Sequence, residues 1–334
     1  MTTTRPKLLL VHGIGGPRDV EEERHTWTRA LAEGARAAGH ADAISALTMG
    51  WSVETDFVHY ADLFTRGGAQ GPSTTELDDD VAELTLAVAV DVIDALLAMP
   101  EHAGDALLLR LRVQAAPAPV NEDGTPKNPE GTGALVRRAS AVCAKLARVP
   151  GVQLAVQRVS SAQCLGMLSQ PGRYLRRKEH AELPQGRGAS LDERVRARVL
   201  DKLDPERPAI VIGHSLGSVI AWESLAAYSG PVALFVTLGS PLAMNALIWQ
   251  RLRPQPPAVP ETVERWVDVW DGDDPVAPRR RSAEVVAPNA AGVRPEPVPV
   301  DSRLLWTHSA LTYLRRREVA GPVMEAVLRL STTS

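Results

Sequence analysis

The chain has 334 residues, of which 44% are apolar and 23% are charged, and these values are ordinary for a globular protein with a sizeable core. Its formal net charge of −3 at pH 7 gives no reason to expect the basic surface that nucleic-acid binding requires, so we expect no nucleic-acid partner. The two cysteines, Cys143 and Cys164, are too few for a disulfide framework, and their neighbours indicate no metal site.

The chain begins with a short apolar segment that is typical of a buried strand. Residues 7–11 (Lys-Leu-Leu-Leu-Val) lead into a glycine-rich segment at 12–16, and apolar residues with helical spacing follow over 21–38. A second strand is predicted at residues 43–51. Because the first apolar run is too short for the core of a signal peptide, we expect a cytoplasmic protein.

The middle of the chain has a different pattern, because its apolar residues recur every three or four positions and proline–glycine breaks divide it into helical pieces. Helices are predicted at residues 73–99, 134–148 and 152–168. The most apolar window, residues 81–99, still carries acidic side chains, so no transmembrane segment is expected. We predict a mainly helical insertion over residues 59–203, between the two parts of a core at 1–58 and 204–334.

Strands and helices alternate again in the last third of the chain. Strands are predicted at residues 209–212, 232–238 and 263–270, and helices at 219–228, 242–252, 305–317 and 322–330. Continuous apolar strands separated by helices are typical of a parallel sheet that is covered on both faces. The sequence therefore predicts an α/β fold with a doubly wound, mainly parallel sheet.

The most informative motif is Gly-His-Ser-Leu-Gly at residues 213–217, between the apolar run 209–212 and a helical segment. A serine on a sharp strand-to-helix turn has its hydroxyl held clear of the chain, and flanking glycines avoid side-chain collisions at the turn. The following helix directs free N–H groups and its positive dipole end at the same place. The alternative is a structural turn, but the matching flanks favour Ser215 as a nucleophile.

A serine hydroxyl needs a base to take its proton and a carboxylate to orient that base. Three acids, Asp271, Asp273 and Asp274, follow the last of the predicted strands, at the sheet edge where parallel sheets bind ligands. We select Asp274 as the carboxylate, with the other two as alternatives. The predicted base is His308, which opens the final helical region. The order of Ser215, Asp274 and His308 matches the nucleophile, acid and base order of one triad lineage.

Two further histidines lie close to the motifs. His12 begins the first glycine-rich segment, and His214 directly precedes Ser215 and is expected to face away from it. We predict structural roles for both imidazoles, because buried polar groups of this kind usually satisfy hydrogen bonds within the fold.

An oxyanion that forms at the serine needs fixed hydrogen-bond donors. One candidate is the N–H of Leu216, which follows the nucleophile, and the other is the N–H of Ile14, in the loop after the first strand. The glycines of residues 12–16 also suggest a dinucleotide-binding fingerprint, but Arg18 occupies the place of its third glycine. A dinucleotide cofactor is therefore not expected.

Together, residues 12–16 and 213–217 with Asp274 and His308 resemble the α/β-hydrolase superfamily, especially its lipase and esterase branches. The resemblance implies Ser215 as nucleophile, Asp274 as acid, His308 as base, and the amides of Ile14 and Leu216 as the oxyanion hole. The stretch between Ser215 and Asp274 is too short for the cap that many members carry after the nucleophile strand. We therefore expect the helical insertion, which precedes that strand, to be the cap.

The expected activity is hydrolysis of a carboxylic ester, small or lipid-like, through an acyl-enzyme, with no metal and no organic cofactor. A thioesterase or an acyltransferase would use the same residues and differ only in leaving group and acceptor. A non-catalytic scaffold that keeps this fold is the alternative from another functional class. The sequence leaves the acyl group, the alcohol and the oligomeric state open.

Overall fold

The computed structural model divides the chain into two compact units. The described residues are 5–16, 18–64, 79–117, 133–149, 161–183, 186–244, 246–274, 276–277, 282–302 and 308–332. Met1–Asp62 and Glu193–Ser334 form one unit, which we call the sheet unit, and Leu63–Asp192 form the other, which we call the helical unit.

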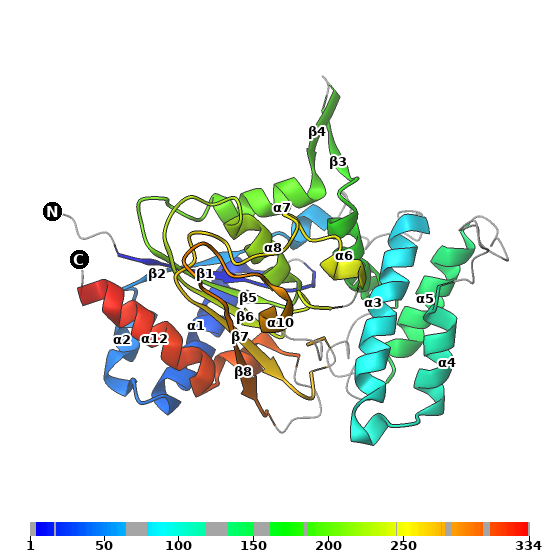
Figure 1. Cartoon of the computed structure of the whole chain (residues 1–334), viewed down its shortest axis with the longest axis horizontal. Helices are drawn as coiled ribbons and strands as arrows, with labels where there is room; N and C mark the ends of the chain where they lie inside the picture. Colours follow the sequence, from blue (N-terminus) through cyan, green and yellow to red (C-terminus); the bar gives the residue numbers. More distant parts are fainter. Residues whose placement is uncertain are drawn as a thin grey trace. The chain divides into compact units, whose positions relative to one another are not determined.

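The sheet unit is built on six strands in the order β2-β1-β5-β6-β7-β8, and all neighbouring pairs are parallel (Figure 1). The strands are β1 (Lys7–Val11), β2 (Glu54–Val58), β5 (Ala209–His214), β6 (Val232–Leu238), β7 (Trp266–Asp271) and β8 (Pro295–Val300). Every residue of β1, β5 and β6 is buried, as expected for strands with both faces covered. The predicted doubly wound parallel sheet is confirmed.

Helices cover the two faces of this sheet (Figure 1). On one face lie α1 (Val20–Ala37), α2 (Ile44–Thr48) and α12 (Arg317–Thr332), and on the other lie α7 (Leu191–Leu200) and α8 (Leu216–Leu225). The short helix α11 (Ala310–Leu314) contacts α1 and α12. Trp27 of α1, Tyr313 of α11 and Met324 of α12 join the side chains of β1 and β5 in one apolar core. The short helices α9 (Ala246–Trp249) and α10 (Ser282–Val285) lie in the connections that flank β7.

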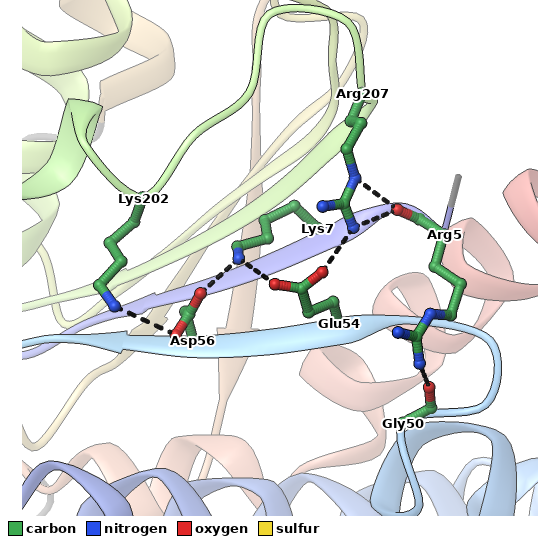
Figure 2. Close-up of polar contacts among 7 residues, drawn as sticks. All are labelled: Arg5, Lys7, Gly50, Glu54, Asp56, Lys202 and Arg207. Carbon is green, nitrogen blue, oxygen red and sulfur yellow. Dashed lines mark hydrogen bonds and ion pairs between the residues drawn. The ribbon is translucent and has the colours of Figure 1, made fainter.

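Charged side chains join the amino-terminal ends of β1 and β2 (Figure 2). Lys7 is 6% exposed and lies between two carboxylates, with its Nζ 2.6 Å from Oε1 of Glu54 and also paired with Asp56. Arg207, just before β5, contacts Glu54 at 2.9 Å and donates to the carbonyl of Arg5. These hydrogen bonds from Lys7 and Arg207 lower the pKa of Glu54 to about 2.

The helical unit has its own packing. Its main helices are α3 (Asp79–Leu97), α4 (Ala106–Ala115), α5 (Ala134–Leu146) and α6 (Ser161–Arg176), with α3 in contact with the other three. Strands β3 (His180–Leu183) and β4 (Gly186–Ser190) form an antiparallel hairpin, which the mainly helical prediction missed (Figure 1). Arg173 is buried and holds both carboxylate oxygens of Glu179, at 2.9 and 2.7 Å.

Several predicted boundaries are wrong. The strand expected at residues 43–51 is helical instead, in Ala41–Ala43 and α2, and the strand β2 begins at Glu54. Alanine and leucine in this segment favour helix, whereas the acids of β2 conceal a strand because they pair with Lys7. The helix expected at 242–252 is only the short α9, and the described helix α6 extends beyond the predicted 152–168, past Pro171.

Candidate active site

The sheet order places two loops at one topological switch point. The chain passes from β1 to β2 on one side of β1 and returns to β5 on the other side. In open parallel sheets, the crevice beyond the carboxyl ends of the strands at such a point is where ligands bind. The glycine-rich loop after β1 and the Ser215 turn after β5 both lie there.

Ser215 occupies a strained turn between β5 and α8. Its backbone φ of 55° and ψ of −132° lie in a region that non-glycine residues rarely adopt. A Cβ atom added at Gly217 would lie 2.1 Å from the carbonyl oxygen of His12, so only glycine lets the loop after β1 pack against this turn. At Gly213 an added Cβ would lie 2.7 Å from Cα of Ser218. Gly217 thus lets the loop contact the turn, and Gly213 lets the chain pass close to the start of α8 within the turn.

The structure brings the side chains of Ser215, Asp274 and His308 together. Nε2 of His308 lies 2.9 Å from Oγ of Ser215, and Nδ1 lies 2.9 Å from Oδ2 of Asp274. Since a carboxylate only accepts hydrogen bonds, Nδ1–H donates to Asp274 and leaves Nε2 to accept from the serine hydroxyl. The Asp274 side chain is 0% exposed and that of His308 is 9% exposed. This arrangement can move a proton from the hydroxyl to the imidazole.

Hydrogen bonding distinguishes the three acids at the end of β7 and in the loop after it. Oδ1 of Asp274 accepts from the N–H of Val276 at 2.8 Å, while its other oxygen contacts His308. The carboxylate of Asp271 is instead engaged with backbone N–H groups, those of Asp273 at 3.0 Å and Ser302 at 2.8 Å. The side chain of the third acid, Asp273, is exposed to solvent. Burial would raise the pKa of Asp274, but its electrostatic interaction and hydrogen bond with His308, together with the hydrogen bonds from Tyr313 and Val276, outweigh burial and lower that pKa, so this carboxyl group stays ionised.

The two amides that the sequence suggested lie in the loop after β1, for Ile14, and at the start of α8, for Leu216. In the described part of the chain, neither the N–H of Ile14 nor that of Leu216 has a hydrogen-bond acceptor. A Cβ added at Gly13 would lie 2.7 Å from Cβ of Ser215, which shows how closely the loop approaches the serine. The buried hydroxyl of Tyr60 donates to the carbonyls of His12 and Gly13, the latter at 3.0 Å, and holds the loop in this position.

His12 and His214 are both buried and lie beside the site. The ring of His12 stacks on that of Tyr60, with centroids 4.2 Å apart, and burial lowers the pKa of His12 to about 3. Burial also holds the pKa of His214 well below its usual value. The ring of His214 packs against that of His308 at a centroid distance of 4.7 Å. Both imidazoles are therefore neutral, and that of His214 supports the ring that bridges Asp274 and Ser215.

Sequence reasoning missed two residues of the site. The hydroxyl of Tyr313 donates to Oδ2 of Asp274 at 2.7 Å. Gly239, directly after β6, has a φ of +51°, and a Cβ added there would lie 2.5 Å from the same Oδ2. Neither residue belongs to a recognisable motif. The only available signal for Gly239 was its place at the end of a predicted strand, and Tyr313 has the sequence context of an ordinary core residue.

Comparison with known proteins supports the fold. The sequence model of the alpha/beta hydrolase family matches residues 167–329, a range that includes Ser215, Asp274 and His308. This match supports the assignment of the chain to the α/β-hydrolase superfamily that its motifs indicated. Neither the curated proteins nor the solved structures contain a significant match to it. Among the described helices, none combines the length and the apolar composition that a membrane crossing requires.

Proposed function

We propose that this chain is a serine hydrolase that cleaves a carboxylic ester through an acyl-enzyme intermediate. The observation that carries the proposal is the His308 imidazole, which lies 2.9 Å from both the Ser215 hydroxyl and the Asp274 carboxylate. These distances allow direct proton transfer from the hydroxyl and stabilisation of the resulting imidazolium by the carboxylate.

The reaction begins when Nε2 of His308 takes the hydroxyl proton and Oγ of Ser215 attacks the ester carbonyl. The amides of Ile14 and Leu216 then hold the negative oxygen of the tetrahedral intermediate, and each such donor stabilises the transition state by about 3 to 4 kcal/mol. His308 returns the proton to the departing alcohol, which leaves an acyl group on Ser215. A water molecule, deprotonated by the same imidazole, releases the acid and restores the serine.

The substrate in this proposal is a small or lipid-like ester, and the helical insertion at residues 59–203 is the cap that selects it. Support for the cap comes from chain order, because the insertion separates β2 from β5 and therefore precedes the nucleophile strand. The same residues would serve a thioesterase or an acyltransferase, for which only the leaving group or the acceptor differs.

A fluorophosphonate probe and chromogenic esters of graded acyl length test the proposal together. We expect the purified chain to react with the probe and to hydrolyse at least one ester, and Ser215→Ala to lose both properties while it unfolds at the same temperature. Product analysis with thioesters and alcohol acceptors separates the related reactions. A native chain that neither reacts with the probe nor turns over any acyl substrate is a scaffold, and the proposal is then wrong.

A further inference from the structure

Tyr313 joins the acid of the site to the core of the sheet unit. Its side chain is 1% exposed, and its ring belongs to the apolar core between the sheet and α12. The hydroxyl donates to Oδ2 of Asp274 at 2.7 Å and accepts from the N–H of Asp271 at 3.1 Å. A single hydroxyl therefore connects the carboxylate with the end of β7.

We propose that Tyr313 is a positioning residue for the reaction: its hydroxyl fixes the Asp274 carboxylate and shares the negative charge that Asp274 directs at His308. The inference rests on the proposed function, since it assigns Tyr313 a part in the same proton transfer. Tyr313 contacts the carboxylate and not the reacting atoms, so it acts through Asp274 and His308.

The first argument is geometric. The two hydrogen bonds to Oδ2 of Asp274, from Nδ1 of His308 and from Tyr313, fix the direction in which this oxygen points. Gly239 closes the remaining side, because an added Cβ there would lie 2.5 Å from Oδ2 and 3.1 Å from Cε2 of Tyr313. Without the hydroxyl, the carboxylate would keep its backbone bonds through Oδ1 but lose one of the two donors that orient Oδ2.

The second argument is electrostatic. Burial raises the pKa of Tyr313 well above its ordinary value, so the hydroxyl remains a donor at every pH at which the enzyme would work. A donor that bonds to Oδ2 withdraws part of the carboxylate charge from His308. When the hydroxyl is removed, the full carboxylate charge acts on the imidazole and favours its protonated form, which cannot act as the base.

Other charged groups around the base do not replace this effect. His214 from β5 packs against His308 and is neutral, because burial holds its pKa well below the usual value. Asp271 from β7 is bonded to backbone N–H groups. The guanidinium of Arg18, in the segment after β1, is paired with Glu23 at 2.7 Å.

The test compares Tyr313→Phe with Tyr228→Phe on the full-length chain. Tyr228 belongs to the same unit, and its buried hydroxyl has no hydrogen-bond partner among the described residues, so it controls for the loss of a phenol oxygen. We expect Tyr313→Phe to lower kcat about tenfold with KM unchanged, and to move the acid limb of the kcat/KM profile up by about half to one pH unit. Tyr228→Phe should leave both unchanged.

A second variant keeps the inference testable if Tyr313→Phe does not fold. Incorporation of 3-fluorotyrosine at position 313 keeps the shape of the side chain and makes its hydroxyl a stronger donor, so the acid limb should move to lower pH. The inference is overturned by a folded Tyr313→Phe that matches Tyr228→Phe in kcat and pH profile, or by a fluorinated variant that shifts in the same direction as phenylalanine. A wild-type chain without activity or probe labelling instead overturns the proposed function itself.

Discussion

At the scale of single residues, hydrogen-bond partners separate side chains that are equivalent in the sequence. Asp271 ends β7 and Asp274 follows it, and both are buried, yet the carboxylate of Asp271 bonds to backbone N–H groups and that of Asp274 to His308. Sequence order and loop position led to the prediction of Asp274, and the structure places its carboxylate beside His308. They could not select Tyr313 or Gly239, because those contacts arise only when α11 and the end of β6 pack against the loop after β7.

Asp274→Asn tests the carboxylate directly. We expect turnover to fall by about 10³- to 10⁴-fold, because an amide neither holds the required imidazole tautomer nor stabilises its cation. The fold should be retained, since an asparagine oxygen can still accept from the N–H of Val276. The measurement is steady-state ester hydrolysis with circular dichroism as the check on folding.

The exposed neighbour provides the control for this variant. Asp273→Asn changes the same charge in the same loop and should retain near-normal turnover, because the Asp273 side chain is exposed. Near-normal turnover in Asp274→Asn would move the orienting role to another acid.

At the scale of secondary-structure elements, the buried strands could be predicted and the edge strands could not. β1, β5 and β6 are continuous apolar runs, which only a sheet covered on both faces explains. β2 contains acids that pair with Lys7, and β8 has proline at alternate positions, so both have the composition of loops. Such edge strands form because a neighbouring strand pairs with them, and the local sequence pattern does not reveal that pairing.

The charged cluster at the start of β1 predicts how stability depends on pH. Because the pKa of Glu54 is lowered to about 2 in the folded chain, from an ordinary 4.5, its contribution is present above the ordinary value and is lost as the pH falls toward 2. The side chain is 40% exposed, so solvent screening limits the effect to about 0.5 to 1 kcal/mol. We expect Glu54→Gln to lower the free energy of unfolding by this amount at pH 7.

Denaturant unfolding at several pH values provides the measurement. The difference between the wild type and Glu54→Gln should shrink steadily between pH 4.5 and pH 2, whereas Glu206→Gln, at an exposed position just before β5, should show no such trend. A difference that stays constant over this interval would mean that the ion pairs do not stabilise the sheet.

At the scale of the whole molecule, one unit supplies every residue proposed for the reaction. Ile14 and His308 are near opposite ends of the chain, and both belong to the sheet unit together with Ser215. The helical unit has its own core and its own buried ion pair, in which Glu179 accepts from Arg173 and Arg176. Stability in that unit therefore rests on contacts that its own residues make.

Glu179→Gln tests this division. Arg173 and Arg176 are largely buried, and this change removes the carboxylate that pairs with both of them. Breaking a buried ion pair in this way lowers the free energy of unfolding by about 3 to 5 kcal/mol. We expect hydrogen exchange, followed by mass spectrometry, to show a larger loss of protection in peptides of the helical unit than in those of the sheet unit. Glu101→Gln, at an exposed position of the same unit, is the control and should leave protection unchanged. Equal loss in both units would show that the two unfold together.

The prolines of β8 determine which hydrogen-bonding groups the edge of the sheet offers to other chains. The ladder with β7 needs N–H donors from β8. Within this strand only Glu296, Val298 and Val300 have an N–H, so the proline nitrogens face away from β7. If the strand of another molecule paired with the outer edge of β8, its N–H groups would find carbonyl acceptors there. Its carbonyl groups would find no N–H donors, because the outward-facing residues are prolines. The sheet thus ends in a border that resists recruitment into larger β-aggregates, without a charged side chain at those positions.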